Sequence, residues 1–473
     1  MAKNLVYDIH DRPKFSQMLI FAVQQLLAIL AATIAVPANV GNGMSSSAAL
    51  FGAGAGTIVY QLFTKFRSPV FLGSSFAFIG SMLAAFAGAT SAKLGFFGLF
   101  LGSVFAGLVY VVIALVVKYV GVAWIDKIMP AAVIGPTVAL IGLSLAGAAV
   151  NDVFSYGPKV AHGLNQYFDM SANIWVSLIC ALVTLITVIV CSVYGKKMVK
   201  LIPFIIGILA GYAVALIFTV IGYIADASAL KVIDFAPFEA LTADGIKITT
   251  FVDIPDFVFV DAFKGVKDFD ASYLATIAVA YIPVAFVVFA EHLADHKNLS
   301  SIIGKDLLEN PGLDRTLLGD GVGSMAGAFF GGCPNTTYGE SVGCVAITKN
   351  ASIATITTTA IMAALVAFIS PFIAFLDSIP GCVMGGVCIT LYGYIAVSGL
   401  KMIQKVDLED SANLFTVSAI LIPGVGGMAM AVGEVYITTI ACALILGIVV
   451  NVLLNKFKKA PAEDADSKEA DGE

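Results

Sequence analysis

Long apolar stretches recur along nearly the whole chain and are separated by short polar segments. Phe97–Val117 and Leu201–Ile224 are typical of them, and each is long enough to cross a bilayer core, which takes about 20 apolar residues in a helix. The pattern predicts fourteen membrane segments. They lie near residues 15–37, 46–64, 70–90, 93–117, 128–150, 172–193, 199–225, 271–295, 313–331, 335–347, 352–375, 378–400, 411–431 and 434–454.

The composition supports an all-α polytopic membrane protein. Of 473 residues, 59% are hydrophobic and 12% are charged, whereas about a quarter of the residues in a soluble chain are charged. The net charge of −6 carries little information, because many acids gather in a polar insert, residues 226–270, and in a tail, residues 457–473. We expect the tail to be disordered. The seven cysteines lack metal-ligand spacing, so we expect no metal site and no cofactor.

The positions of Lys and Arg predict the topology. With both termini in the cytoplasm, twenty of the 26 basic residues fall on the inner side. The outer side receives Lys93, Lys159 and four residues of the insert. This bias agrees with the rule that cytoplasmic loops are enriched in Lys and Arg, so the insert is predicted to lie outside the cell.

The two halves of the chain resemble each other. "MPAAVIG" (129–135) aligns with "IPGCVMG" (379–385), and "GSSFAFI" (73–79) aligns with "GESVGCV" (339–345). An odd number of segments in each half makes the second half inverted, an architecture typical of secondary transporters with a site at the repeat interface. The predicted units are residues 1–225, the insert, residues 271–456 and the tail. The third and tenth segments are short and interrupted by Gly and Pro, so each is expected to contain an extended strand.

Carboxyl groups within apolar segments indicate a polar pocket. Glu291 ends the run "VVFAE" in the eighth segment, and Glu340 lies on the broken tenth segment. A charge in hydrocarbon is costly and usually faces a cavity or a partner, although Glu291 could instead snorkel or pair structurally. Asp295 follows Glu291 by one turn on the same helix face and is a candidate for proton transfer. Asp295 and His296 are expected nearer the membrane interface, and His292 is expected to be structural.

The broken segments supply the other groups of a binding site. A chain that turns from extended to helical leaves unpaired N–H groups at the helix start, here near Ser75 and Phe76 and near Gly339 and Glu340. Such groups attract carbonyl or anionic oxygens, and glycine lets a flat ligand approach the backbone. Three aromatic residues could flank this ligand, although ordinary packing explains each of them alone. They are Phe76, Tyr338 and Tyr392.

Five motifs resemble the bacterial uracil permeases of the nucleobase–ascorbate transporter family. The motifs are "GSSFAFI", "AEHLADH", "KDLLENPGLDR", "PNTTYGESVGCVAITK" and "IPGCVMGGVCITLYG", and the resemblance covers about residues 12–456. "NTTYGE" is the most specific of them and separates the uracil branch from the purine and ascorbate branches. The resemblance implies two inverted repeats of seven segments, with a core domain of segments 1–4 and 8–11 and a gate domain of segments 5–7 and 12–14.

The resemblance also implies roles for individual residues. Glu291 and Glu340 would hold a pyrimidine, assisted by the main-chain amides of Phe76 and Gly339. The pocket would be lined by Ala32, Tyr338 and Tyr392. Members of the family are proton symporters of the bacterial inner membrane, and dimers occur among them. The chain departs from the family where Ser341 replaces the usual Asn, which would leave room for a water molecule. It departs also where Gln25 and Asp295 replace histidines, so any relay would pass through Asp295.

The expected function is therefore import of uracil with protons, and the chain is not expected to be an enzyme. Two carboxyl groups can accept from the ring N–H groups of uracil, and helix-start amides can donate to its carbonyl oxygens. Because the ligand is neutral, the coupling ion must be a cation, and burial favours a protonated carboxyl. The alternatives are a purine or anion transporter of the same fold, a channel, and a membrane hydrolase, for which no catalytic motif is present. The expected partners are uracil, the proton, membrane lipids and a second copy of the chain, and no nucleic acid.

Overall fold

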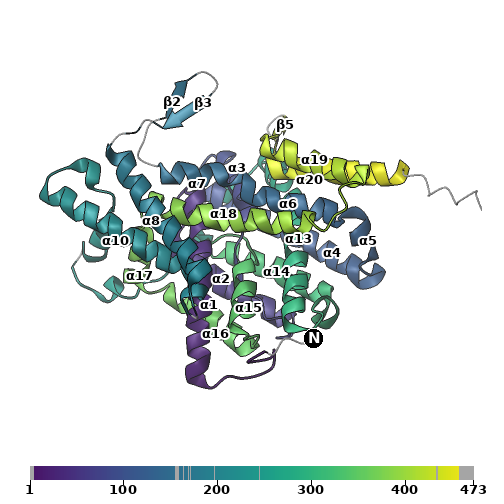
Figure 1. Ribbon diagram of the computed structural model, residues 1–473, viewed down its shortest axis with the longest axis horizontal. Coiled ribbons are helices and arrows are strands. Elements are labelled where there is room, and N and C mark those ends of the chain that lie inside the picture. Colours follow the sequence, from purple (N-terminus) through teal and green to yellow (C-terminus); the bar gives the residue numbers. More distant parts are fainter. Residues whose placement is uncertain are drawn as a thin grey trace, which may run out of the picture.

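The structure is a computed structural model that describes residues 5–457 except 155–158, 163–164, 169, 171, 197, 244 and 433–434. Figure 1 shows a body built almost entirely of helices. Within the described residues, eight helices are long and apolar enough to cross a membrane, so the chain is a multi-pass membrane protein. They are Phe15–Val40, Ala92–Val120, Ala131–Val153, Asn173–Tyr194, Pro203–Ile224, Ala271–Ile303, Gly381–Ile403 and Thr439–Lys456.

One set of helices packs around a central pair of strands. α14 lies against α2 and α4, α13 lies against α3 and α4, and α16 lies against α1 and α2. The set consists of α1 (Phe15–Val40), α2 (Ser46–Phe63), α3 (Ile79–Ala87), α4 (Ala92–Val120), α13 (Ala271–Ile303), α14 (Leu313–Phe329), α15 (Gly339–Thr348) and α16 (Ile353–Val366). The strands are β1 (Leu72–Ser74) and β4 (Asn335–Thr337), and the turn η1 (Phe76–Phe78) follows β1.

A second set of helices packs around α18, which crosses the middle of Figure 1. α18 contacts α6, α7 and α8, α10 packs on α8, and α19 packs on α20 and α6. The set consists of α6 (Ala131–Ser144), α7 (Ala146–Val153), α8 (Ala172–Tyr194), α10 (Pro203–Ile224), α18 (Gly381–Ile403), α19 (Ser411–Val425) and α20 (Thr439–Phe457). Short helices α5 (Ala123–Ile128), α9 (Met198–Leu201) and α17 (Ser370–Asp377) and the hairpins β2–β3 (Lys159–His162, Asn165–Phe168) and β5–β6 (Met430–Val432, Val435–Ile437) complete the fold.

Glycine runs allow α2 and α14 to pack closely. A Cβ on Gly56 would lie 2.6 Å from the carbonyl oxygen of Gly323, and one on Gly52 would lie 2.8 Å from that of Gly327. No side chain fits at these separations, so the helices touch backbone to backbone. The runs "GAGAG" and "GDGVG" therefore serve helix packing, as small residues do in membrane proteins.

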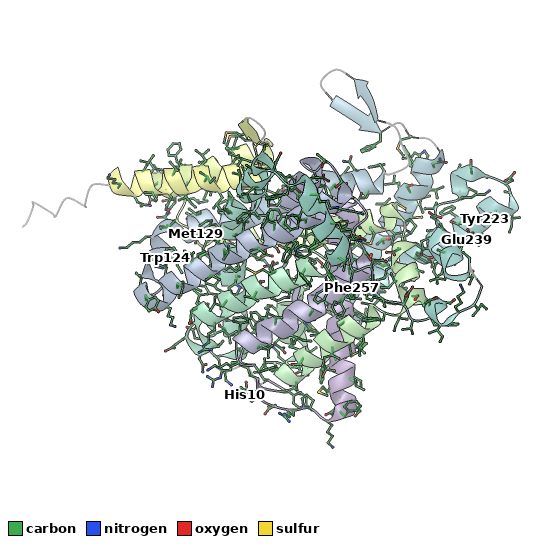
Figure 2. All side chains as sticks on the ribbon, turned by 180° about the vertical axis from the view of Figure 1, so that it is seen from behind. His10, Trp124, Met129, Tyr223, Glu239 and Phe257 are labelled. Atoms are coloured by element: carbon green, nitrogen blue, oxygen red, sulfur yellow. The ribbon has the colours of Figure 1, made fainter. Side chains whose placement is uncertain are left out.

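The polar insert spans one face of the molecule. It contains α11 (Ala236–Thr242) and α12 (Phe259–Lys264), and these helices pack on α17 and on α4, respectively. Figure 2 shows Tyr223 and Glu239 together in a lateral lobe, while Phe257 lies nearer the middle of the body. Between them, Val252 pairs with Ile369 in an antiparallel bridge. The insert thereby joins the segment between α16 and α17 to the first set of helices.

Three predicted segment boundaries were wrong. α13 continues to Ile303, eight residues beyond the expected end, and stops at Gly304, which has a φ of 71°. The segment expected at 352–375 is broken, because the Phe368 carbonyl and the Ser370 amide bond to the backbone of the insert and not to a continuing helix. The segment expected at 411–431 ends at Val425, where Gly427 with a φ of 75° turns the chain into a hairpin. Most of the acidic tail lies outside the described residues.

Candidate functional site

The two broken segments meet at the centre of the first helix set. β1 and β4 pair in antiparallel fashion with Gly73 opposite Thr336, and all of their residues are buried. A hydrogen bond of 2.9 Å from the Ser75 amide to the Pro334 carbonyl extends the pairing. The extended strands predicted for the third and tenth segments are thus confirmed. Each strand ends where a helix begins, so two helix N-termini lie close to the same point.

These helix starts present polar groups with few internal partners. η1 begins at Phe76 and α15 begins at Gly339, and the first N–H groups of a helix have no acceptor within it. The hydroxyl of Ser75 is buried and has no hydrogen-bond partner among the described residues. Glu340 lies in the first turn of α15, so its carboxyl group is close to these amides. A ligand oxygen could bond to the amides at these helix starts directly.

Both predicted acids of α13 lie on the side of these helix starts. Asp295 Oδ2 accepts a hydrogen bond of 2.8 Å from Thr337 Oγ1 on β4. Glu291, one turn earlier, is only half-buried and is close enough to Asp295 and Glu340 that each of them would repel a negative charge on it. Three carboxyl groups from α13 and α15 therefore converge.

An opening lies beside Asp295 at the start of α15. Gly339 is exposed although it sits at the centre of the fold, and among the described residues a Cβ placed on it would have one neighbouring atom within 4 Å, Asp295 Oδ1 at 3.8 Å. One turn along the helix, a Cβ on Gly343 would have no neighbour within 4 Å. The face of α15 is therefore bare backbone. It gives a flat ligand room to lie against the main chain with acids on its edges.

Aromatic rings border the opening on two sides. Tyr338 lies over Gly73, where a Cβ would overlap its ring, and its hydroxyl donates a hydrogen bond of 2.8 Å to the Ser74 carbonyl. The rings of Phe76 and Tyr392 meet edge to face with centroids 5.5 Å apart. Because Tyr392 belongs to α18, this contact links the two helix sets.

The structure brings most of the predicted site residues together. Glu291, Asp295, Gly339 and Glu340 surround the opening, with the aromatic residues and Ser75 beside it. Ala32 is fully buried on α1. Its neighbour Thr33 interacts with the Tyr338 hydroxyl, which places α1 behind that ring.

Two features of the site differ from expectation. Ser341 does not leave a gap, because its hydroxyl accepts from the Gln25 amide group and, at 3.3 Å, from the Phe71 backbone N–H. Thr337 was not predicted as a partner of Asp295. Alternation along the strand "NTT" puts Asn335 and Thr337 on the same side, and this pattern could have identified it.

The comparisons with known proteins point to one family. A model of the Permease family matches residues 16–433. The uracil permease of Bacillus caldolyticus is 38% identical over 95% of this chain and 94% of its own length. The uracil permease of Bacillus subtilis (strain 168) is 36% identical over 99% and 98%, and that of Escherichia coli (strain K12) is 32% identical over 97% of each. The chain belongs to the Permease family. This permease is therefore a membrane transporter and not an enzyme.

Solved structures agree with the fold of the permease. The transmembrane domain of the cyanobacterial bicarbonate transporter BicA matches with a TM-score of 0.58 at 14% identity, covering 94% of this chain and all of that one. SLC26A9 matches with a TM-score of 0.59 at 12% identity, covering 95% of this chain and 67% of that one. The arrangement of helices is thus shared with proteins of very different sequence.

Proposed function

We propose that this permease imports uracil together with protons by alternating access. The observation that carries the proposal is the opening at Gly339, where Glu291, Asp295 and Glu340 converge on exposed backbone. The relatives named uracil permeases, which match over nearly their whole lengths, support uracil as the substrate.

The groups at the opening complement the groups of uracil. The ring has two N–H donors and two carbonyl acceptors in one plane. Glu291 and Glu340 accept from the N–H groups, while the amides of Phe76 and Gly339 donate to a carbonyl oxygen and Ser75 supplies a further hydroxyl. The rings of Tyr338 and Tyr392 and the methyl group of Ala32 complete the walls. A purine or another analogue that leaves one buried group unpaired would bind less tightly.

The proposed architecture divides the chain into a core and a gate. Fourteen segments form two inverted repeats, residues 1–225 and 271–456, and the first helix set corresponds to segments 1–4 and 8–11. The second set, which forms the gate, corresponds to segments 5–7 and 12–14. Support comes from β1 and β4, which occupy matching places in the two halves and pair with each other. The substrate lies between the sets, where Phe76 meets Tyr392.

Proton coupling is assigned to Glu291, with Asp295 as its relay. A proton neutralises Glu291 from outside, the pocket then accepts neutral uracil, and the loaded core crosses to the inner side. A bare carboxylate would oppose this crossing, because charge is costly in an apolar environment. Release of the proton by way of Asp295 precedes release of uracil. No metal or cofactor is needed for this cycle.

The proposed location is the bacterial plasma membrane, with both termini in the cytoplasm and lipids around the helices. The distribution of Lys and Arg supports this orientation. A homodimer is proposed by analogy with the family.

The test is uptake of radiolabelled uracil into proteoliposomes with and without an inward proton gradient. Accumulation that requires the gradient is expected, and unlabelled uracil and its 5-substituted analogues should compete for it. Xanthine should not compete. Strong competition by xanthine with weak competition by uracil would assign the permease to purines, and flux without saturation would indicate a channel.

A further inference from the structure

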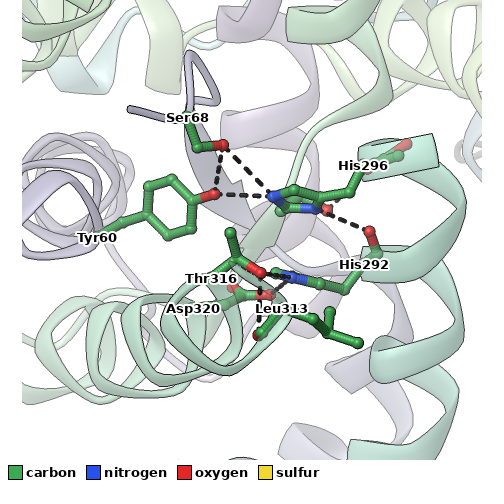
Figure 3. A network of polar contacts seen from close by, with 9 residues as sticks. Tyr60, Ser68, His292, His296, Leu313, Thr316 and Asp320 are labelled. Atoms are coloured by element: carbon green, nitrogen blue, oxygen red, sulfur yellow. Dashed lines mark hydrogen bonds and ion pairs between the residues drawn. The ribbon is translucent and has the colours of Figure 1, made fainter. Parts of the chain in front are cut away.

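A buried polar network lies behind the acids of α13. Figure 3 shows His292 and His296 stacked on one another, with Asp320 and Thr316 of α14 beside the first ring and Tyr60 and Ser68 beside the second. The two ring centroids are 4.0 Å apart, and both histidines are fully buried. Neither residue reaches the opening at Gly339. Their contacts connect α13 to α14 on one side and to α2 and the segment before β1 on the other.

His292 is held by two groups of α14. Its Nδ1 lies 2.7 Å from Asp320 Oδ2, and its Nε2 lies 3.0 Å from Thr316 Oγ1. The Thr316 hydroxyl donates to the carbonyl of Leu313, at 3.1 Å, so it must accept from Nε2–H. The contact between Nδ1 of His292 and Oδ2 of Asp320 needs a second proton, which is bound either to the ring or to the carboxyl group. The pair is therefore electrically neutral as a whole, which suits its burial.

His296 is held by its own helix and by α2. Its Nδ1 lies 2.9 Å from the carbonyl oxygen of His292 and must donate, because a carbonyl only accepts. The remaining nitrogen, Nε2, lies 2.8 Å from the hydroxyl of Tyr60 and 3.4 Å from that of Ser68. These two hydroxyls are 2.7 Å apart. A neutral ring donates at Nδ1 and accepts at Nε2, and the two hydroxyls supply two hydrogens for the three contacts among Nε2, Tyr60 and Ser68.

Helix geometry relates this network to the acids. Successive residues of an α-helix are rotated by about 100°, so Glu291 and Asp295 share one face of α13 and His292 and His296 share another, about 100° away. A rotation of α13 by one residue would therefore move the carboxyl groups away from the opening and bring the imidazoles into their place. Apolar packing restrains such rotation only weakly, because it has no direction, whereas buried hydrogen bonds specify a unique arrangement.

We propose that His292 and His296 are positioning residues that fix the rotation of α13, so that Glu291 and Asp295 face the substrate opening. The inference rests on the proposed function for the identity of the ligand. It assigns the two imidazoles no contact with substrate. They act through the hydrogen bonds to Asp320 and Tyr60. Loss of either bond lets α13 rotate, so that Glu291 and Asp295 are no longer held in position.

The experiment distinguishes the effect of the hydrogen bond between His296 and Tyr60 from the effect of the size of the imidazole ring. His296→Asn keeps a donor near the His292 carbonyl but is too short to reach Tyr60, whereas His296→Gln reaches the tyrosine hydroxyl. Tyr60→Phe removes the same bond from the other side with little change in shape. Purified, monodisperse variants are titrated with uracil by calorimetry. His296→Asn and Tyr60→Phe should each weaken binding about three- to tenfold, and His296→Gln should not.

The double variant decides between positioning and general damage. His296→Asn and Tyr60→Phe break the same hydrogen bond. The variant that carries both changes should therefore bind uracil no more weakly than either single variant. Additive losses, or normal affinity in a folded His296→Asn protein, would overturn the proposal. The wild-type titration reports on the proposed function by itself.

A second measurement needs no ligand. The variant Glu291→Cys is labelled with a water-soluble maleimide, in a background whose native cysteines are all buried. Its labelling rate should change about threefold or more with His296→Asn or Tyr60→Phe and remain unchanged with His296→Gln. Equal rates in all these proteins would refute the positioning role, even if the substrate were not uracil.

Discussion

The hydroxyl of Thr337 donates a hydrogen bond of 2.8 Å to the carboxylate of Asp295. The bond joins β4, which leads directly into α15, to the turn of α13 that carries Glu291. Thr337 is fully buried, so no water can replace its hydroxyl without rearrangement. The contact therefore fixes the distance between the two elements that bear Glu291 and Glu340.

Thr337→Val should impair proton-driven uptake. Valine keeps the shape of threonine but cannot donate, so Asp295 loses a hydrogen bond worth about 0.5–1.5 kcal/mol. Initial rates under a proton gradient should fall about tenfold, whereas Thr337→Ser, which keeps the hydroxyl, should stay near wild type. Normal rates with Thr337→Val would show that the bond to Asp295 plays no part in transport.

Glu340→Ala should abolish uracil binding while leaving a folded, monodisperse protein. The change removes an acceptor for a ring N–H and leaves that donor unpaired in the pocket. Calorimetric titration measures the loss. Glu239→Ala, on the exposed insert, is the matched control and should bind normally. Near-normal affinity of Glu340→Ala would remove Glu340 from the site.

The sequence predicted the centre of the site better than its surroundings. The glycine and proline interruptions identified β1 and β4, and the spacing of Glu291 and Asp295 put both on one face of α13. The contact between His296 and Tyr60 could not be predicted, because hydropathy does not reveal which polar group a buried imidazole meets inside the fold. The hydrogen bond between Gln25 and Ser341 could not be predicted either, since it joins residues far apart in sequence.

Cysteines at positions 252 and 369 should form a disulfide. Val252 and Ile369 face each other across an antiparallel bridge, where Cβ atoms lie about 4.5–5.5 Å apart, and both side chains are partly exposed. The native cysteines are buried and should not compete. Mild oxidation followed by proteolysis within the insert and non-reducing electrophoresis would detect the link. Fragments that separate without reductant would contradict this docking of the insert, and each single-cysteine variant serves as control.

The ion pair of Lys305 and Asp8 should contribute to stability only above acidic pH. Lys305 Nζ donates to Asp8 Oδ2 at 2.6 Å, and this hydrogen bond lowers the pKa of the Asp8 carboxyl below its ordinary value of 3.8. A lowered pKa means that the stabilisation is present at neutral pH and is lost as pH falls through the folded-state value.

Both side chains of this pair are nearly half exposed, so solvent screening limits the effect to at most about 1 kcal/mol. Lys305→Met should therefore lower the melting temperature slightly at neutral pH, with a difference that vanishes well below pH 3.8. Thermal denaturation in detergent at several pH values measures it. Lys297→Met is the control for loss of an exposed lysine. A difference between Lys305→Met and wild type that persists in acid would have another origin.

Glu291→Gln should separate binding from proton coupling. Glutamine resembles the protonated acid in size and hydrogen bonding but cannot release a proton. The variant should therefore exchange internal for external uracil while failing to concentrate it on a proton gradient. In the wild type, uptake should fall as external pH rises, because fewer Glu291 side chains are protonated on the outer side before uracil binds. Glu291→Gln should lose this pH dependence.

Glu291→Asp, which can still carry a proton, should retain part of the accumulation. If Glu291→Gln still accumulates uracil on a proton gradient, another group carries the proton, and Asp295, one turn away and bonded to Thr337, is the next to be replaced.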